Sequence, residues 1–362
     1  MRFESAQFKY TQRDRGLDQF KGMLICLIVL GHNYFFSANF PKLFSFIYGF
    51  HVISFLLIPF LFLAPTFGQS SAQRRTDLCE KLIRILVPHL WFLALAASIF
   101  CALNIVLGSS HFFPWLRDLF VALLVQQETN FRATVGTGLL WFLPAYALQA
   151  VLIWRYRSFD KLQRRVVILL AFTWHLVFGA TPVSNNPLPW SFSLVSYLFV
   201  IGLLVGEVNR RMNWNRILDL ALVVIWVVCS FLVIEQRFFH TLAGDIRAPV
   251  SIMNPLELLL QDGFIVLSFF ALMRFASRIP IHFLEVIGRH SLQIFLIHSF
   301  VWQILWRVFF NRVEYSGLVI AILTTGVSFG LTLLISFAGS KLIEISPLQR
   351  WIFPRSIFPL RA

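Results

Sequence analysis

Charge is scarce in this chain. Only 13% of its 362 residues are charged, whereas 58% are hydrophobic, and the mean hydropathy is +0.74. A soluble domain of this length cannot bury that much apolar surface, so the composition excludes a soluble protein and predicts a polytopic membrane protein. The apolar runs are too long for the strands of a membrane barrel. An all-α bundle, which satisfies its backbone hydrogen bonds within each segment, is the expected fold class.

Cysteine and the common catalytic motifs are also scarce. Three of the four cysteines, Cys26, Cys101 and Cys229, fall within apolar runs, and Cys79 falls in a loop. This placement excludes a disulfide framework and a thiolate metal site. The sequence also lacks G-x-S-x-G, H-E-x-x-H, a phosphate-binding glycine loop and His spacings typical of metal ligation. We therefore expect no metal and none of the common soluble-enzyme chemistries.

Hydropathy and the polar segments between apolar runs predict about ten membrane spans. A single transmembrane domain, 17–343, would lie between two short tails, 1–16 and 344–362. The predicted spans are 17–36, 46–67, 82–107, 136–154, 165–181, 190–207, 216–236, 255–275, 283–310 and 317–343.

The formal net charge of +14 reflects this topology. When the spans alternate across the membrane, most of the 31 Lys and Arg residues fall on the side that carries both tails. Positively charged loops remain cytoplasmic, so both termini are predicted to be cytoplasmic in the cell inner (plasma) membrane. The excess charge then implies attraction to anionic membrane lipid, and no nucleic-acid partner is expected.

Asp18 and His32 are ionisable residues within the first predicted span. Ionisable groups in a membrane span are costly and indicate functional sites. At about 1.5 Å per helical residue, His32 would lie roughly 21 Å beyond Asp18 and past the midplane of the bilayer. A neutral imidazole suits a general base, and Asn33 would be its neighbouring hydrogen-bonding group. The alternative is a histidine that only hydrogen-bonds between helices.

Two cations, Lys81 and Arg84, precede the third span and are three residues apart. On a helix they would share a face at its cytoplasmic end, where they would bind the phosphates of a nucleotide-like donor. The alternative is that both side chains extend to the membrane interface without binding a ligand.

Polar residues are also concentrated in the ninth span, 283–310. Arg289, Ser291 and His298 interrupt an otherwise apolar segment, and Ser291 and His298 would share one helix face. We therefore expect a polar cavity here. Asp262 in the eighth span needs a partner, for which His298 and Arg289 are candidates.

Together these segments resemble the acyltransferase-3 family of integral-membrane acyltransferases, including its O-acetyltransferase branch. In two places the chain differs from the family pattern. Ile58-Pro59-Phe60 stands where the family often has Ser-Gly-Phe, and Lys81 replaces the first Arg of an Arg-x-x-Arg element. The segments that carry the resemblance are Asp14–Gly22, Val29–His32, Phe50–His51, Lys81–Arg84, Leu140–Leu143 and Gly288–His298.

The resemblance implies transfer of an acyl group, by default acetyl from cytoplasmic acetyl-CoA, to a hydroxyl of a cell-surface polysaccharide or lipid-linked sugar. Acetyl-CoA would be a donor substrate, with no permanently bound cofactor. In this interpretation His32 is the general base, oriented by Asp18 or Asn33, and Lys81 and Arg84 bind the donor. The expected polar cavity would contain Arg289, Ser291, His298 and Trp141. An alternative from the residues alone is a proton-coupled transporter or flippase that uses the buried His and Asp groups.

Overall fold

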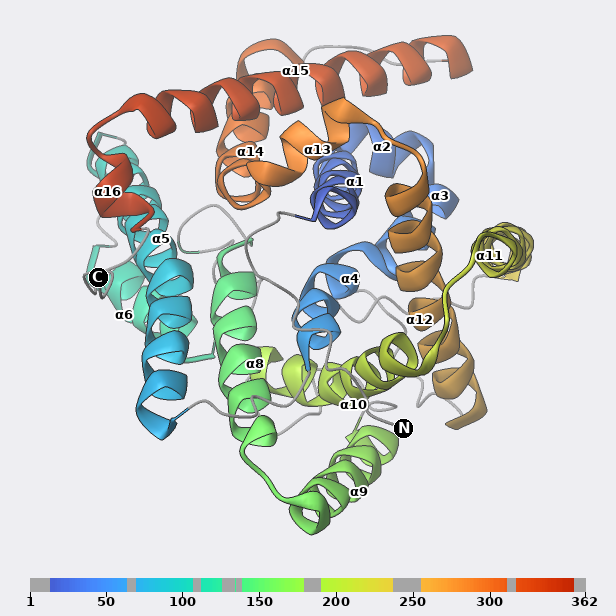
Figure 1. The fold of residues 1–362 in the computed structure, drawn as a ribbon. Coiled ribbons are helices and arrows are strands. Elements are labelled where there is room, and N and C mark those ends of the chain that lie inside the picture. Colours follow the sequence, from blue (N-terminus) through green and yellow to red (C-terminus); the bar gives the residue numbers. More distant parts are fainter. Residues whose placement is uncertain are drawn as a thin grey trace.

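The computed structural model describes residues 14–63, 70–106, 112–125, 134, 139–178, 190–236, 255–310 and 317–354, and within these ranges it contains helices and no strand. Figure 1 shows their arrangement as a bundle. The elements are α1 (Arg15–Gly31), α2 (Tyr34–Asn39), α3 (Pro41–Tyr48), α4 (His51–Leu57), η1 (Ile58–Phe62), α5 (Ser71–Val106), α6 (Phe112–Val125), η2 (Leu139–Trp141), α8 (Phe142–Arg157), α9 (Lys161–Phe178), α10 (Trp190–Arg211), α11 (Arg216–Gln236), α12 (Pro255–Arg278), α13 (His282–Arg289), α14 (Ser291–Leu305), η4 (Trp306–Phe310), α15 (Leu318–Ile345) and α16 (Gln349–Ile352).

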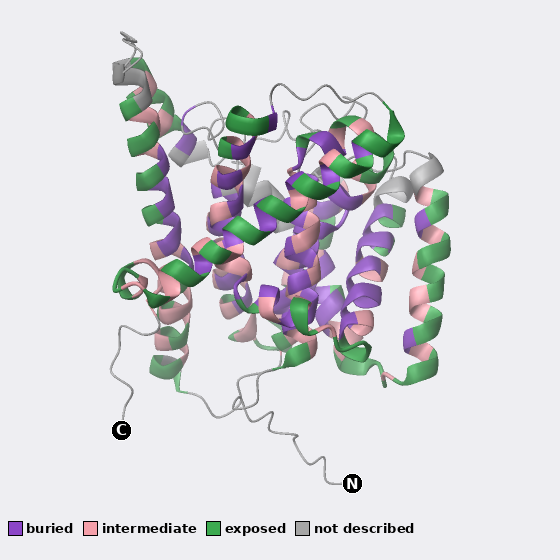
Figure 2. Ribbon diagram, turned by 90° about the horizontal axis from the view of Figure 1, so that it is seen from above, coloured by how far each residue is buried: buried purple, intermediate pink, exposed green. Residues whose placement is uncertain are grey.

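The outer surface of the bundle is apolar. On α11, the residues Ile217, Leu220, Val224 and Phe231 recur at helical spacing, and each is at least half exposed. Figure 2 shows the same pattern on other peripheral helices, which are exposed on one face and buried on the face toward the bundle. Water would not tolerate so much exposed apolar surface, whereas lipid would. The protein is therefore a multi-pass membrane protein.

Six helical segments in the described part of the chain are long and apolar enough to cross a bilayer. Four further predicted spans, the first, fourth, fifth and sixth, correspond to helices α1, α8, α9 and α10. The number of ten membrane crossings and the orientation of the termini remain predictions. The six segments are Pro41–Phe62, Ala72–Ala102, Arg216–Val233, Leu259–Arg278, Ser291–Phe310 and Leu318–Ile345.

Helix α1 lies in the middle of the bundle and packs on α4, α12, α13 and α14 (Figure 1). Its apolar side chains Phe20, Leu24 and Ile28 are fully buried. Two glycines permit a close crossing of α1 and α13. A Cβ atom at Gly22 would collide with the backbone carbonyl of Leu284, and one at Gly288 would collide with that of Asp18. The crossing therefore depends on the absence of a side chain at both positions.

The first predicted span is not one continuous helix. Helix α1 ends at Gly31, His32 is its C-terminal cap, and Asn33 caps the N-terminus of α2 by accepting hydrogen bonds from the Phe35 and Phe36 N–H groups. The Asn33 amide also donates to Ser328 Oγ at 2.8 Å, which fastens this break to α15. His32 therefore lies at the end of a helix, and its backbone conformation is not helical.

The ninth predicted span is divided as well. His290 lies between α13 and α14, with a backbone conformation (φ −104°, ψ 11°) that ends the first of these helices. Arg289 therefore belongs to α13, which packs on the beginning of α1, whereas Ser291 and His298 belong to α14.

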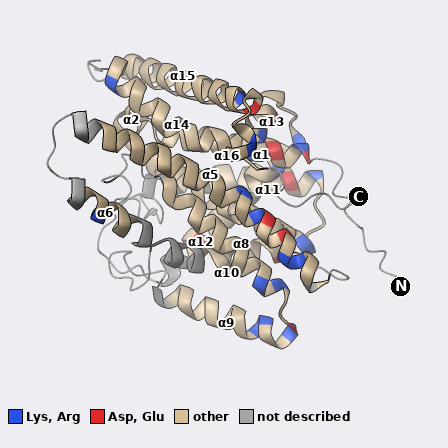
Figure 3. Cartoon of the chain, turned by 90° about the vertical axis from the view of Figure 1, so that its left-hand side faces the viewer, with Lys and Arg blue, Asp and Glu red and all other residues tan. Residues whose placement is uncertain are grey.

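Charged residues gather at one end of the bundle, which includes the beginning of α5 and helix α13, and few occur at the opposite end (Figure 3). Ion pairs join helices at this charged end. Asp219 of α11 is buried. Its carboxylate accepts hydrogen bonds from two arginines of α12, Arg274 Nε at 2.7 Å and Arg278 Nε at 2.5 Å. This contact fixes the otherwise exposed α11 to the bundle.

Candidate active site

The side chains around His32 form a cluster from three parts of the chain. The His32 ring lies 5.4 Å from the His298 ring of α14, between ring centres. The Tyr48 hydroxyl of α3 is 3.3 Å from His32 Nδ1 and donates to the Gly31 carbonyl at 3.2 Å. A Cβ atom at Gly31 would lie 2.8 Å from the Tyr48 ring and 3.5 Å from His51 Nε2. Gly31 thus allows Tyr48 and His51 of α4 to approach His32.

The Tyr48 hydroxyl is thus a hydrogen-bonding neighbour of the His32 ring. A neutral imidazole accepts a proton through its unprotonated nitrogen. His32 is therefore a candidate general base.

His51 and His298 are held in the same tautomer by backbone carbonyls. His51 Nδ1 donates to the Ile47 carbonyl at 2.6 Å, and His298 Nδ1 donates to the Phe295 carbonyl at 2.8 Å. Both side chains are fully buried, and the Nε2 atom of each has no hydrogen-bond partner in the described structure. The cluster therefore contains two further acceptor nitrogens that a hydroxyl-bearing substrate would satisfy.

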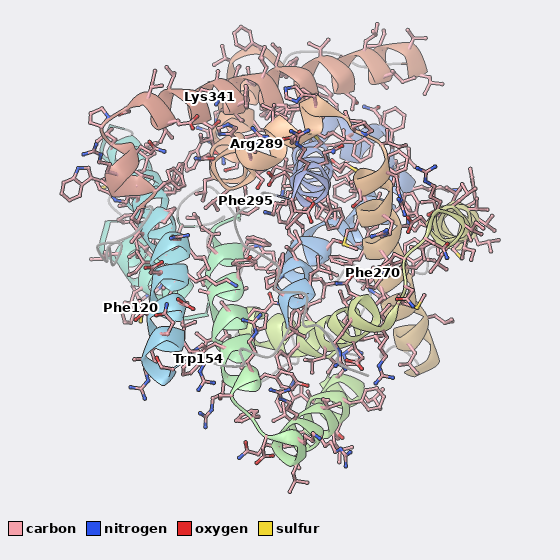
Figure 4. All side chains as sticks on the ribbon, viewed as in Figure 1. Phe120, Trp154, Phe270, Arg289, Phe295 and Lys341 are labelled. Atoms are coloured by element: carbon pink, nitrogen blue, oxygen red, sulfur yellow. The ribbon has the colours of Figure 1, made fainter. Side chains whose placement is uncertain are left out.

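Asp18 lies at the other end of α1, roughly 21 Å from His32 by helical rise. Its carboxylate is 3.8 Å from Lys21 Nζ and 3.9 Å from Arg289 Nε, and Arg289 also pairs with Glu285. Figure 4 labels Arg289 beside α1 in this network. The structure thus groups Asp18 and Arg289 with each other and separates both from His32.

Asn33 adjoins His32 in sequence, but its amide and carbonyl groups bind α15 and α2, as described above. Asn33 therefore stabilises the non-helical backbone between α1 and α2, next to His32. Tyr48 contacts the His32 ring directly, and no sequence motif indicated this residue.

The predicted polar cavity is only partly assembled. Trp141 is buried at the end of η2, and the adjoining Phe142 ring contacts the Phe295 ring at 4.8 Å. Phe295 is in turn 5.9 Å from the His298 ring, and Figure 4 labels it on the side of α14 that faces α8. Trp141 and His298 therefore lie in one region. Ser291 is half-buried at the first residue of α14, seven residues before His298.

Lys81 and Arg84 point in different directions. The Lys81 ammonium lies over the Tyr146 ring of α8, 6.0 Å from its centre, and is repelled by the nearby Arg157 guanidinium. Arg84 is exposed and pairs with Glu80 at 3.3 Å. The cation that approaches Lys81 is thus Arg157. In the sequence, Arg157 was indistinguishable from the other basic residues of the cytoplasmic loops.

Asp262 has neither of its two expected partners, His298 and Arg289. Its carboxylate is hydrogen-bonded to His175 Nε2 of α9 at 2.6 Å, and both side chains are buried. Among the described residues, no group of three or more His, Cys, Asp or Glu side chains is placed to hold a metal ion.

The fold and the site define an integral membrane protein with a histidine cluster inside its helix bundle. A family model described as an acyltransferase domain, that of the acyltransferase-3 family, matches residues 14–341. The chain belongs to this family and is a membrane acyltransferase. No curated protein and no solved structure matches the chain.

Proposed function

We propose that this protein is an O-acetyltransferase that moves an acetyl group from acetyl-CoA to a hydroxyl of a cell-surface polysaccharide or lipid-linked sugar. The observation that carries the proposal is the position of His32 inside the helix bundle, in one cluster with Tyr48 and His298. Acyl transfer to a hydroxyl needs such a base, since an unactivated hydroxyl is a poor nucleophile.

In the proposed reaction, His32 Nε2 accepts the proton of the sugar hydroxyl while the hydroxyl oxygen attacks the thioester carbonyl. The tetrahedral intermediate then collapses: the carbon–sulfur bond breaks, the acetyl ester remains on the sugar, and the CoA thiolate leaves. The imidazolium of His32 returns its proton to the thiolate, so the base is regenerated. A general base of this kind typically contributes about 10²- to 10⁴-fold to the rate.

The charged end of the bundle supports a cytoplasmic donor site. Acetyl-CoA is a cytosolic anion, and Lys81 and Arg157 supply positive charge at this end of α5 and α8. Both termini would be cytoplasmic, in agreement with the concentration of Lys and Arg in Figure 3 and with the positive-inside rule. His32, at the far end of α1, would then meet an acceptor glycan on the outer side of the inner membrane.

The test is transfer of radiolabelled acetyl from acetyl-CoA to cell-envelope glycan in membranes that contain the wild-type chain or His32→Ala at equal protein levels. We expect the variant to lose at least 99% of the label, which is the lower range of general-base catalysis. The control is Tyr156→Phe, whose ring packs on Phe199 at the other end of α8. Unchanged labelling in His32→Ala would refute the role of His32, and no labelling by the wild type would refute acetyl transfer to glycan.

A further inference from the structure

A row of aromatic rings adjoins the histidine cluster. Helix α2 begins at Tyr34, two residues after His32, and the Tyr34 ring lies 4.5 Å from the Trp306 ring of η4, between ring centres. The Phe35 ring lies 5.6 Å from the Trp306 ring and 6.3 Å from the Trp302 ring of α14. The start of α2 and the end of α14, which are distant in the sequence, are thus joined by aromatic contacts.

The aromatic row continues the helix face that carries His298. Trp302 and Trp306 follow His298 by four and eight residues, so the row extends roughly 12 Å beyond His298 on one side of the helix. Ile304 and Val308 lie on the opposite side and are exposed, as expected for a surface against lipid. A tryptophan that only anchors a helix in the membrane interface would lie on that exposed side. Trp302 and Trp306 instead face α2.

The rings of the aromatic row are only partly covered. Tyr34 is 45% exposed, and Trp302 and Trp306 are half-buried, whereas the Phe35 ring behind them is fully buried. Trp306 is also the first residue of a π-helical turn, Trp306–Phe310, a rare conformation that is frequent at functional sites. A partly open aromatic surface at such a turn indicates a ligand that has an apolar face.

The aromatic row lies where the acceptor is proposed to arrive. Figure 3 labels α2 at the end of the bundle opposite to the concentration of charged residues. At the inner end of the row, the His298 side chain is fully buried, and its Nε2 has no hydrogen-bond partner in the described structure. A ligand on the row would therefore meet an unsatisfied nitrogen beside His32, which a hydroxyl would satisfy.

We propose that Tyr34 and Trp306 form a subsite for a sugar ring of the acceptor. A pyranose has C–H groups on its faces and hydroxyls around its edge, so it can lie on an aromatic ring while its hydroxyls bond other groups. Because the row is longer than one sugar ring, the sugar on Tyr34 and Trp306 would be the neighbour of the sugar whose hydroxyl reaches His32. The inference rests on the proposed transfer to a sugar hydroxyl, and it names residues that select the acceptor.

The first experiment measures acetyl transfer by the purified full-length protein to a de-O-acetylated envelope glycan extract, which contains polysaccharide and lipid-linked sugars. Trp306→Ala and Tyr34→Ala are each expected to raise the KM for this glycan roughly 2- to 12-fold, the contribution of one aromatic contact, and to leave the KM for acetyl-CoA unchanged. Trp306→Phe retains a ring and should recover most of the loss. Trp351→Ala is the control, since Trp351 is an exposed tryptophan of α16 outside the row. An unchanged glycan KM, or equal changes in both KM values, would refute the subsite.

The second experiment does not depend on acetyl transfer. Equilibrium binding of the same glycan, labelled with tritium, is measured for the wild type and for Trp306→Ala without acetyl-CoA. We expect Trp306→Ala to weaken binding by the same factor as it raises the glycan KM. Equal binding by both proteins, or no binding by the wild type, would refute the subsite. Binding that depends on Trp306 in a protein without acetyltransferase activity would support the subsite and refute only the proposed reaction.

Discussion

Replacing Tyr48 by Phe tests how His32 is prepared for catalysis. The substitution removes only the hydroxyl, while the ring remains packed against Phe44, whose centre is 4.3 Å away. The lost interactions are the hydrogen bond between the Tyr48 hydroxyl and His32 Nδ1, at 3.3 Å, and the bond that Tyr48 donates to the Gly31 carbonyl. One neutral hydrogen bond contributes about 0.5–1.5 kcal/mol, so we expect kcat to fall roughly 2- to 12-fold. Tyr48 would thus be a positioning residue.

The assay is steady-state acetyl transfer by purified protein, with kcat and the KM for acetyl-CoA measured separately. KM should stay constant, because Tyr48 lies in the His32 cluster, whereas the donor phosphates are proposed to bind at Lys81. Tyr156→Phe is the matched control: its ring packs on Phe199 at the other end of α8. If Tyr48→Phe were as inactive as His32→Ala, the phenol itself would take part in the chemistry. If kcat were unchanged, Tyr48 would not position the His32 ring. Either result would refute this account of His32.

Three further predictions concern binding and stability. Lys81→Ala is expected to raise the KM for acetyl-CoA and Arg84→Ala to leave it unchanged, in steady-state kinetics, because only Lys81 faces the bundle interior. Asp219→Ala is expected to lower the free energy of unfolding by about 3 kcal/mol in detergent with kcat unchanged, since it leaves two arginines without their buried partner. Gly288→Val is expected to prevent folding, seen as loss of monodisperse protein in gel filtration, whereas Gly326→Val, which has open space, should fold.

Hydropathy predicted the simple helices well. The predicted span 216–236 has the same bounds as α11, and the predicted start of the span 255–275 is that of α12. In both cases the apolar run is flanked by polar residues or Pro, so the run and the helix end at the same position. Hydropathy did not predict the end of α1 at Gly31, because His32 caps this helix and Asn33 caps the next within a run that remains apolar on both sides. Caps are local hydrogen bonds that a hydropathy average does not record.

Helix geometry explains why Lys81 and Arg84, which were predicted to act together, point in different directions. Lys81 and Arg84 are three positions apart, or about 60° around a helix, so the boundary between the inner and outer face can pass between them. Helical spacing assigns residues to a face of their own helix but does not specify which distant residue faces them. The partners of Asp18 and Asp262, Arg289 and His175, are therefore apparent only in the folded chain.

Helix α1 shows why the proposed base is a histidine with neutral partners. At the charged end, Asp18 lies among Lys21 and Arg289, where the membrane interface supplies water and counter-charges. The other end is surrounded by Tyr48, backbone carbonyls and aromatic rings. A carboxylate there would require a buried partner, as Asp262 does in His175. An imidazole, unlike a carboxylate, has a neutral form that can accept a proton from a hydroxyl. A histidine can therefore act as a base in this apolar region without the desolvation cost of a permanent charge.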